Sequence, residues 1–290
     1  MRRGAGFTLI ELVIVIAISA IVSTFIFRNI AAPIEGFADL SRRARLVDVA
    51  ETALARMTRE IRLALPNSVR VTAGGQSLEF LRTLTGGRYR ADVDPGDPLS
   101  DPIDFAFTAD SFDVLGPLDG NLAAEVSGGA GGVDDCLNGS SDCLVIFNTG
   151  QPADCAAQPQ PQRTNAYCGD NLAGVVAVTP AQVSFDASGA AGSPFQFGSP
   201  GQRFHIVDTP VSFVCSGVTL ERHAGYAITP AQQAAPGGSV ALLANRVGAC
   251  SFRYDPGTAT RAGVVTIALT IREGSETVTL LQQVHVPNVP

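Results

Sequence analysis

Residues 6–27 read GFTLIELVIVIAISAIVSTFIF, and this stretch decides the fold. From residue 7 it runs for 21 residues with a single charge, Glu11, until Arg28 ends the apolar run. At about 1.5 Å per residue, a helix of this length spans the hydrocarbon core of a bilayer, which is roughly 30 Å thick. Arg2 and Arg3 come just before it, so the positive-inside rule predicts that the rest of the chain is exported.

Glu11 needs an explanation, because a carboxylate in the middle of a membrane helix costs about 2.5–3.5 kcal/mol. A cut between Gly6 and Phe7 supplies one. The new α-ammonium of Phe7 would lie at a helix N-terminus, where the helix dipole is already positive. Glu11, about one turn further on, would balance that charge in its own chain or in a neighbouring subunit. A desolvated pair of this kind selects a register more than it adds stability.

Two simpler interpretations of this segment stay open. The first is an ordinary secretory signal peptide that is cut near residues 17–19, but the apolar run continues past that site. The second is an uncleaved membrane anchor. Neither interpretation explains why Glu11 lies inside the span.

Residues 6–13, GFTLIELV, resemble the processing motif of type IV prepilins and type II secretion pseudopilins. This resemblance implies that a prepilin peptidase cleaves after Gly6 and N-methylates Phe7, which leaves the positive charge in place. It also implies that the partners are other minor and major pilins, an inner-membrane assembly platform and, before assembly, the lipid bilayer. The implied location is a single-pass inner-membrane protein with a periplasmic C-terminal domain that later reaches the pilus or cell surface.

Two longer stretches resemble one group of these proteins. Residues 37–71 (FADLSRRARLVDVAETALARMTREIRLALPNSVRV) and 280–290 (LLQQVHVPNVP) are similar to an MshO-type minor pilin of the mannose-sensitive haemagglutinin (MSHA) pilus biogenesis group. Residues 243–286 more distantly resemble the J-type minor pseudopilin. The resemblance implies a minor pilin that helps to initiate or cap an MSHA-type pilus used in surface attachment. The alternatives are a minor pseudopilin of type II secretion and a tip adhesin. Glu11 puts an outermost position in doubt, because the subunit at the extreme tip of a secretion pseudopilus usually lacks this glutamate.

The pattern predicts a short leader (1–6), a transmembrane and assembly helix (7–28), an amphipathic helix (29–66) and a β-rich domain (67–290). Pro33 and Gly36 predict a kink or a melted turn between the two helical segments. Apolar residues at helical spacing predict a stripe that packs on a sheet: Leu40, Val47, Ala50, Leu54, Met57, Ile61 and Ala64.

Short alternating segments separated by Gly, Pro, Asp and Asn follow residue 67 and predict antiparallel strands. We therefore expect an α+β, type IV pilin-like fold, in which the long helix packs on an antiparallel sheet domain. Residues 120–171, rich in Gly and Pro, are expected to form a large disulfide-stapled loop that varies between subunits. The strand candidates are residues 68–72, 77–82, 104–108, 143–148, 174–178, 182–186, 203–207, 211–215, 217–223, 239–243, 250–254, and a hairpin of 264–273 and 277–286.

All six cysteines lie beyond residue 130, and an even number in an exported domain predicts disulfides. Sequence proximity favours three of the possible pairings: Cys136–Cys143, Cys155–Cys168 and Cys215–Cys250. A zinc site is the competing interpretation. It is disfavoured because the chain has no CxxC and because its three histidines, His205, His223 and His285, are scattered.

The net charge of −7 divides unevenly along the chain. Residues 1–62 hold nine arginines and six acidic residues, whereas residues 63–290 hold 11 arginines and 21 acidic residues. An acidic body argues against nucleic-acid binding, which needs clustered cations. The arginines of the stem are either a solvated, salt-bridged face or a contact for acidic neighbours.

Four acidic residues, Asp92, Asp94, Asp97 and Asp101, are a weak candidate for a Ca²⁺ site. Their spacing does not match an EF-hand, and an acidic proline turn is the alternative. No catalytic set and no phosphate-binding loop is recognisable in the sequence. We therefore expect no enzymatic activity and no cofactor.

Overall fold

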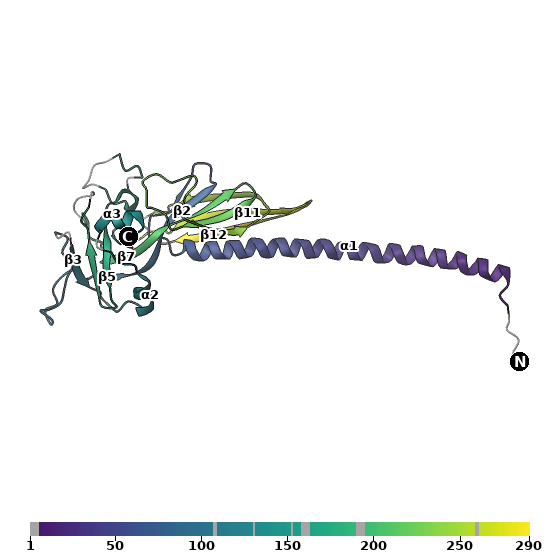
Figure 1. Ribbon diagram of the computed structural model, residues 1–290, viewed down its shortest axis with the longest axis horizontal. Coiled ribbons are helices and arrows are strands. Elements are labelled where there is room, and N and C mark those ends of the chain that lie inside the picture. The colour runs from purple at the N-terminus through teal and green to yellow at the C-terminus, as the bar shows by residue number, and fades with distance from the viewer. Residues whose placement is uncertain are drawn as a thin grey trace.

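The computed structural model describes residues 6–106, 109–129, 131–151, 153–157, 163–189, 195–258 and 261–290, with the backbone alone for 28–35, 38, 109 and 122. One long helix extends from an elongated β-rich body (Figure 1). The far end of the helix bears the N-terminus, and the other end lies against the body. This α+β arrangement confirms the predicted fold class.

Helix α1 spans Leu9–Ile61, 53 residues, or about 80 Å. Its backbone is helical through Pro33 and Gly36, so the expected melted turn is wrong, and Figure 1 shows only a gradual curve. A proline inside a helix removes one backbone hydrogen bond. The turns on both sides keep theirs and need no new nucleus, so the helix continues across the gap.

The body contains two antiparallel sheets. Nine strands form the first sheet: β1 (Arg70–Val71), β2 (Ser77–Arg88), β7 (Arg203–Ser216), β4 (Cys143–Ile146), β5 (Leu172–Val178), β6 (Gln182–Asp186) and β3 (Ala109–Asp113) in spatial order, with β8 (Thr219–Ala224) on β7 and β9 (Ser239–Ala244) on β8. The second sheet has the order β10 (Val247–Asp255), β11 (Gly263–Glu273) and β12 (Glu276–Val286). Three short helical segments complete the body: α2 (Gly120–Glu125), α3 (Gly132–Asn138) and η1 (Ala166–Cys168).

Strand β7 joins the two parts of the large sheet. Its residues 204–207 pair with β4 on the side away from β2, whereas residues 211–216 pair with β8. Pro210, which has no N–H to donate, lies where these partners change, and β2 opposite shows register shifts after Leu81. We expected two separate strands here, because Asp208-Thr209-Pro210 has the composition of a turn. That expectation is wrong, since the proline is accommodated at a position where a ladder bond is dispensable.

The buried side chains form two clusters. The distal core lies among β2 to β7 and is rich in aromatic residues, with Phe112 edge-on to Phe204 at 5.2 Å between ring centroids. The helix-side core lies between the C-terminal half of α1, the β2–β7–β8 part of the large sheet and the three-stranded sheet. Each fully buried apolar side chain contributes about 1.5–3 kcal/mol, so this core fixes the helix to the body.

The buried stripe of α1 differs in part from the predicted one. It begins at Leu46, which is 2% exposed, and Leu40 is 70% exposed because α1 meets the body only beyond it. Val47 is half-buried, and Leu46 and Ala53 take the buried positions that a strict seven-residue spacing misses. The other predicted members are buried: Ala50, Leu54, Met57, Ile61 and Ala64.

Two further expectations are corrected. The strand expected at residues 104–108 is displaced to β3, because residues 105–106 form a turn; residues 107 and 108 lie outside the described part of the chain. Segment 120–171 is more than a loop, since it supplies β4, whose residues are buried between β7 and β5. The predicted closing hairpin forms, with Glu273 opposite Glu276 across a two-residue turn whose Gly274 has φ of 61°.

Candidate assembly surface

The predicted cleavage site lies just ahead of α1 in non-helical backbone. Gly6 and Phe7 are exposed, and the Phe7 side chain is 80% accessible. Apart from its chain neighbours, no atom of the described residues lies within 4 Å of the position that a Cβ on Gly6 would take. A protease needs a non-helical, uncovered peptide to bind a substrate backbone, so the geometry suits processing at this bond. Residues 1–5 of the predicted leader lie outside the described residues.

Glu11 takes part in a capping box at the start of α1. The Glu11 backbone N–H donates to Thr8 Oγ1 at 3.3 Å, and the Thr8 N–H donates to Glu11 Oε2 at 3.5 Å. The carboxylate is thereby held over the positive end of the helix dipole, one turn from Phe7. Sequence reasoning singled out Glu11 but missed Thr8. The spacing of a threonine and a glutamate three residues later was the available signal.

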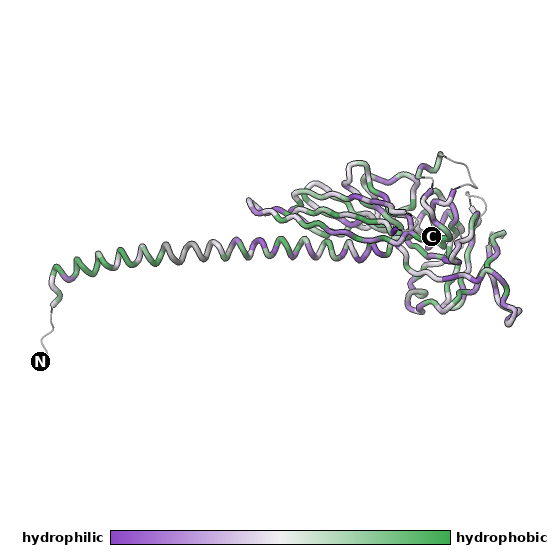
Figure 2. The backbone as a smooth tube through the Cα atoms, turned by 180° about the vertical axis from the view of Figure 1, so that it is seen from behind, coloured by the Kyte–Doolittle hydropathy of each residue, from purple (hydrophilic) through white to green (hydrophobic). Residues whose placement is uncertain are grey.

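Leu9–Phe27 is long and apolar enough to cross a membrane. Its 19 residues have a mean hydropathy of 2.7, and none of this stretch is buried against the body. Figure 2 shows the apolar end of α1 projecting away from the body as a bare rod. The Thr24 hydroxyl donates to the Ala20 carbonyl oxygen at 2.8 Å, which satisfies a polar group that lipid could not. Such a surface needs lipid or other apolar helices to cover it.

Two apolar side chains of α1 closer to the body are also bare. Phe37 and Leu40 are 75% and 70% exposed. Beyond Leu40, side chains of α1 begin to contact the body, and the arginines separate into two groups. Arg222 of β8 donates to Glu60 at 2.5 Å, and Arg56 lies 3.4 Å from the same carboxylate. Arg59 and Arg62 are exposed, and neither makes an ion pair within the described residues.

The three disulfides are those that sequence proximity favoured. Cys136–Cys143 links α3 to β4, with 5.1 Å between Cα atoms. Cys155–Cys168 has a Cα separation of 5.4 Å. Cys215–Cys250 joins the end of β7 to β10, with Cα atoms 6.0 Å apart, and so links the two sheets behind the helix-side core.

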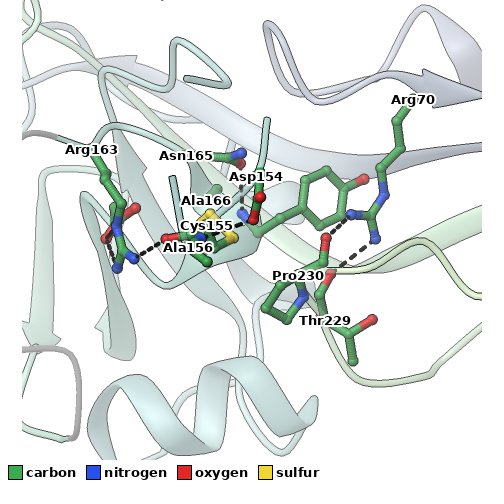
Figure 3. Close-up of a disulfide and its surroundings, with 12 residues drawn as sticks. Arg70, Asp154, Cys155, Ala156, Arg163, Asn165, Ala166, Thr229 and Pro230 are labelled. Atoms are coloured by element: carbon green, nitrogen blue, oxygen red, sulfur yellow. Dashed lines mark hydrogen bonds and ion pairs between the residues drawn. A yellow bond between two sulfur atoms is a disulfide. The ribbon is translucent and has the colours of Figure 1, made fainter. Parts of the chain in front are cut away.

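Arginines hold the surroundings of the Cys155–Cys168 disulfide on two sides (Figure 3). Arg163 donates to the Cys155 carbonyl oxygen at 2.7 Å and to the buried Asp170 at 2.9 Å. Arg70 lies over the ring of Tyr167, the residue before Cys168, with its guanidinium carbon 3.6 Å from the ring centroid. Arg70 also pairs with Glu79, whose carboxylate is buried, so this corner of the body is tied together by charge-assisted contacts.

Three of the four candidate Ca²⁺ residues accept hydrogen bonds from their own turn or from β3. Asp94 accepts from the Gly96 N–H at 2.8 Å, Asp97 from the Leu99 N–H at 3.1 Å, and Asp101 from the Ser111 hydroxyl at 2.6 Å. Asp92 is exposed. Among the described residues, no group of three or more His, Cys, Asp or Glu side chains is arranged to hold a metal ion.

The three histidines remain separate from one another in the fold. His205 lies on β7, and burial, helped by Arg203, lowers its pKa to about 4. His223 is buried on β8, with Nε2 at 3.5 Å from Glu221. His285 is exposed on β12.

A sequence profile described as the prokaryotic N-terminal methylation motif matches residues 1–27. No curated protein and no solved structure matches the chain. The motif defines a family of structural pilin subunits, and it implies processing by a prepilin peptidase and assembly with other pilins. An apolar helix near the N-terminus, consistent with membrane anchoring, and an antiparallel, disulfide-linked β domain accompany it here. The motif and the fold together support assignment of this chain to the type IV pilin-like family. The motif indicates a type IV pilin-type prepilin, which is a substrate of prepilin peptidase.

Proposed function

We propose that this chain is a minor pilin that helps to initiate or cap an MSHA-type type IV pilus used in surface attachment, and that it has no enzymatic role. One observation carries the proposal: a single continuous helix has one half buried in its own body and the other half bare. Lipid covers the bare half while the subunit waits in the inner membrane. Helices of neighbouring subunits cover it once the subunit enters a filament.

In this proposal, cleavage between Gly6 and Phe7 creates the charge that Glu11 balances. Before the cut, the Glu11 carboxylate accepts the Thr8 N–H. After the cut, the new ammonium of Phe7 lies one residue before that donor, so the carboxylate is already placed where the positive charge appears. A neighbouring subunit's amine can compete for the same carboxylate, and that exchange would set the step between subunits.

The MSHA assignment rests on the resemblance of residues 37–71 and 280–290. In the structure, both segments contribute to the helix-side core, because α1 and β12 pack on each other. Residues 243–286, which resemble the J-type pseudopilin, form β10 to β12 and so belong to that core as well. This likeness supports a second candidate function, that of a minor pseudopilin of type II secretion.

A strain that lacks this chain separates the candidate functions. Loss of pili, with protein export intact, supports initiation or capping. Normal pili with poor attachment would support the tip adhesin, and failure of export with normal pili would support the pseudopilin. Deletion of residues 120–171 is unsuitable for this purpose, because it removes the central strand β4 and unfolds the sheet.

Complementation with Glu11→Ala sharpens the test. We expect the variant to be cleaved and retained in the membrane, but to enter filaments at least about tenfold less than the wild type, the ratio that about 1.4 kcal/mol of lost pairing produces. Glu11→Asp, which keeps the charge, should restore part of the incorporation. Normal filament entry of Glu11→Ala would contradict the pairing on which the proposal depends.

A further inference from the structure

A groove runs between α1 and β12, on the outer side of the helix-side core. Its volume is about 560 Å³. Strand β12 is the last strand of the three-stranded sheet, so among the described residues its outer edge pairs with no other strand. The residues that line the groove are Glu51, Leu54, Ala55, Thr58, Arg59 and Arg62 of α1 and Leu280, Leu281 and Gln282 of β12.

The groove is apolar at its floor and positive at one end. Leu281 is 68% exposed, although it lies on a strand whose inward-facing neighbours are well packed. Arg59 and Arg62, one turn apart on α1, make no ion pair within the described residues, and they outnumber Glu51, the one acidic residue of the lining. A leucine and two free guanidinium groups beside a concave surface suit an occupant that combines an apolar side chain with carboxylates.

The body itself carries a segment of that chemistry. Residues 92–104 hold five aspartates and no arginine, and Leu99 at their centre is 92% exposed. The turn is closed by its own bonds: the Asp97 N–H donates to the Asp94 carbonyl oxygen at 3.0 Å, and the Asp94 N–H donates to Ser100 Oγ at 2.7 Å. Leu99 is therefore held outward on a pre-formed turn, which reduces the entropy lost on binding.

The turn and the groove cannot meet within one subunit. The turn precedes β3, at the end of the body farthest from the bare half of α1, whereas the groove lies where α1 meets β12 (Figure 1). Two complementary surfaces at different ends of one molecule form a heterologous, head-to-tail contact between two copies.

We propose that the groove between α1 and β12 binds the Leu99 turn of a second copy of this chain. Leu99 inserts beside Leu281, and two exposed aspartates of the turn, Asp92 and Asp97, lie toward Arg59 and Arg62. The contact is small, well below the area that a stable dimer needs, so it holds only when the bare helices are packed together. The inference rests on the proposed filament function and assigns to it a specific contact between bodies.

Cysteine crosslinking of the full-length chain in cells tests this contact. Two differently tagged copies are produced together, one with Leu99→Cys and the other with Leu281→Cys. No native cysteine among the described residues is free to react. The matched control pairs Leu99→Cys with Val240→Cys, which is 58% exposed on β9. We expect at least about tenfold more mixed dimer from the groove pair than from the control pair.

Charge reversal provides the second measurement. The double variant Arg59→Glu and Arg62→Glu in the copy with Leu281→Cys should reduce the crosslink several-fold, because it sets like charges opposite each other. Asp92→Arg and Asp97→Arg in the partner copy should restore it. These residues are exposed, so the body should keep its folded stability.

Three results would overturn the inference: equal crosslinking of the groove and control pairs, no rescue by the second charge reversal, or capture by Leu281→Cys of a different pilin in place of the second copy. Filament entry and the mature N-terminus are measured in the same strains. If the processed subunit enters filaments normally without the groove crosslink, this contact is wrong and the proposed function stands. If processed subunits never enter filaments, the proposed function itself fails.

Discussion

The two halves of α1 are built from similar apolar residues but find different partners. Leu46, Met57 and Ile61 are at most 2% exposed, because the two sheets of their own chain cover them. Residues 9–27 are more apolar still, yet none of this stretch is covered. The C-terminal half has one apolar stripe and charged side chains elsewhere, whereas the N-terminal half is apolar all round. A helix with one apolar stripe packs that stripe against a folded body, whereas a helix that is apolar all round packs in a membrane or in a bundle of helices.

The strongest test of this difference places one charge in the buried half of α1 and one on its exposed stem. Met57→Asp buries a carboxylate with no partner in the helix-side core, so we expect it to destabilise the body by more than about 4 kcal/mol. Leu40→Asp, on the exposed stem, should change stability by less than about 0.5 kcal/mol. Urea unfolding of the detergent-solubilised chain, followed by its β-sheet circular dichroism, measures both. Similar midpoints for the two variants would refute the division of α1.

The reciprocal change tests the bare half. Ile16→Asp should leave the urea midpoint of the body unchanged but weaken membrane retention by about 100-fold, since a mid-span aspartate costs about 2.5–3.5 kcal/mol. Alkaline extraction of membranes separates retained from released chain, with Ile16→Leu as the control. A lowered midpoint in Ile16→Asp would show that this half also stabilises the body.

The body should also respond to pH in a way that the bare half does not. His205 has a pKa of about 4 in the fold against 6.5 when exposed, so between these values only the unfolded chain binds the proton. The stability that neutral His205 contributes is therefore complete above pH 6.5, and about 3 kcal/mol of it is lost as the pH falls to 4. Burial raises the pKa of Asp142 to about 6, which gives the opposite slope at acid pH.

Replacing the histidine separates these two contributions. His205→Gln should remove the acid-induced loss and leave the gain from Asp142, so its urea midpoint should fall less than that of the wild type between about pH 7 and pH 4.5. His285→Gln, at an exposed position, serves as the control. An unchanged pH profile in His205→Gln would assign the acid sensitivity to other groups.

The smallest expected effect concerns the first turn of α1. Thr8→Val removes the side-chain oxygen that accepts the Glu11 N–H, so the helix start should lose about 1 kcal/mol. Amide hydrogen exchange should quicken at residues 9–12 and stay unchanged at residues 46–61. Thr24→Val offers a matched control, because that hydroxyl only bonds back to its own helix. Faster exchange throughout α1 would contradict a purely local cap.

Much of this architecture is readable from the sequence, because local rules govern it. The length of the apolar run, the closing hairpin and the disulfide pairs follow from spacing and turn chemistry. Two features depend on tertiary partners and were not readable. Pro210 lies inside a continuous strand because β7 changes partners there. Strand β4 lies between distant strands although its surroundings have the composition of a loop. Pro33 was misjudged for a local reason, because the turns on both sides of it keep the helix continuous.

The residues of the candidate site also divide into those set by local sequence and those set by tertiary packing. Gly6, Phe7 and Glu11 could be proposed from the sequence because the processing motif is a short local pattern within residues 6–13. The groove between α1 and β12 was not, because Arg59 and Leu281 are brought together only by the packing of the last strand on the helix. Leu40 was placed in the wrong environment because the sequence does not state where the helix meets the body.

The central claim is that the bare half of α1 becomes an assembly surface whose first residue is Phe7. Mass spectrometry of the N-terminal peptide from sheared filaments tests it most directly. The account predicts a peptide that begins at Phe7 and carries one added methyl group, recovered in the filament fraction. A mature chain that begins at any other residue, or a chain that retains residues 1–6 within filaments, would contradict it.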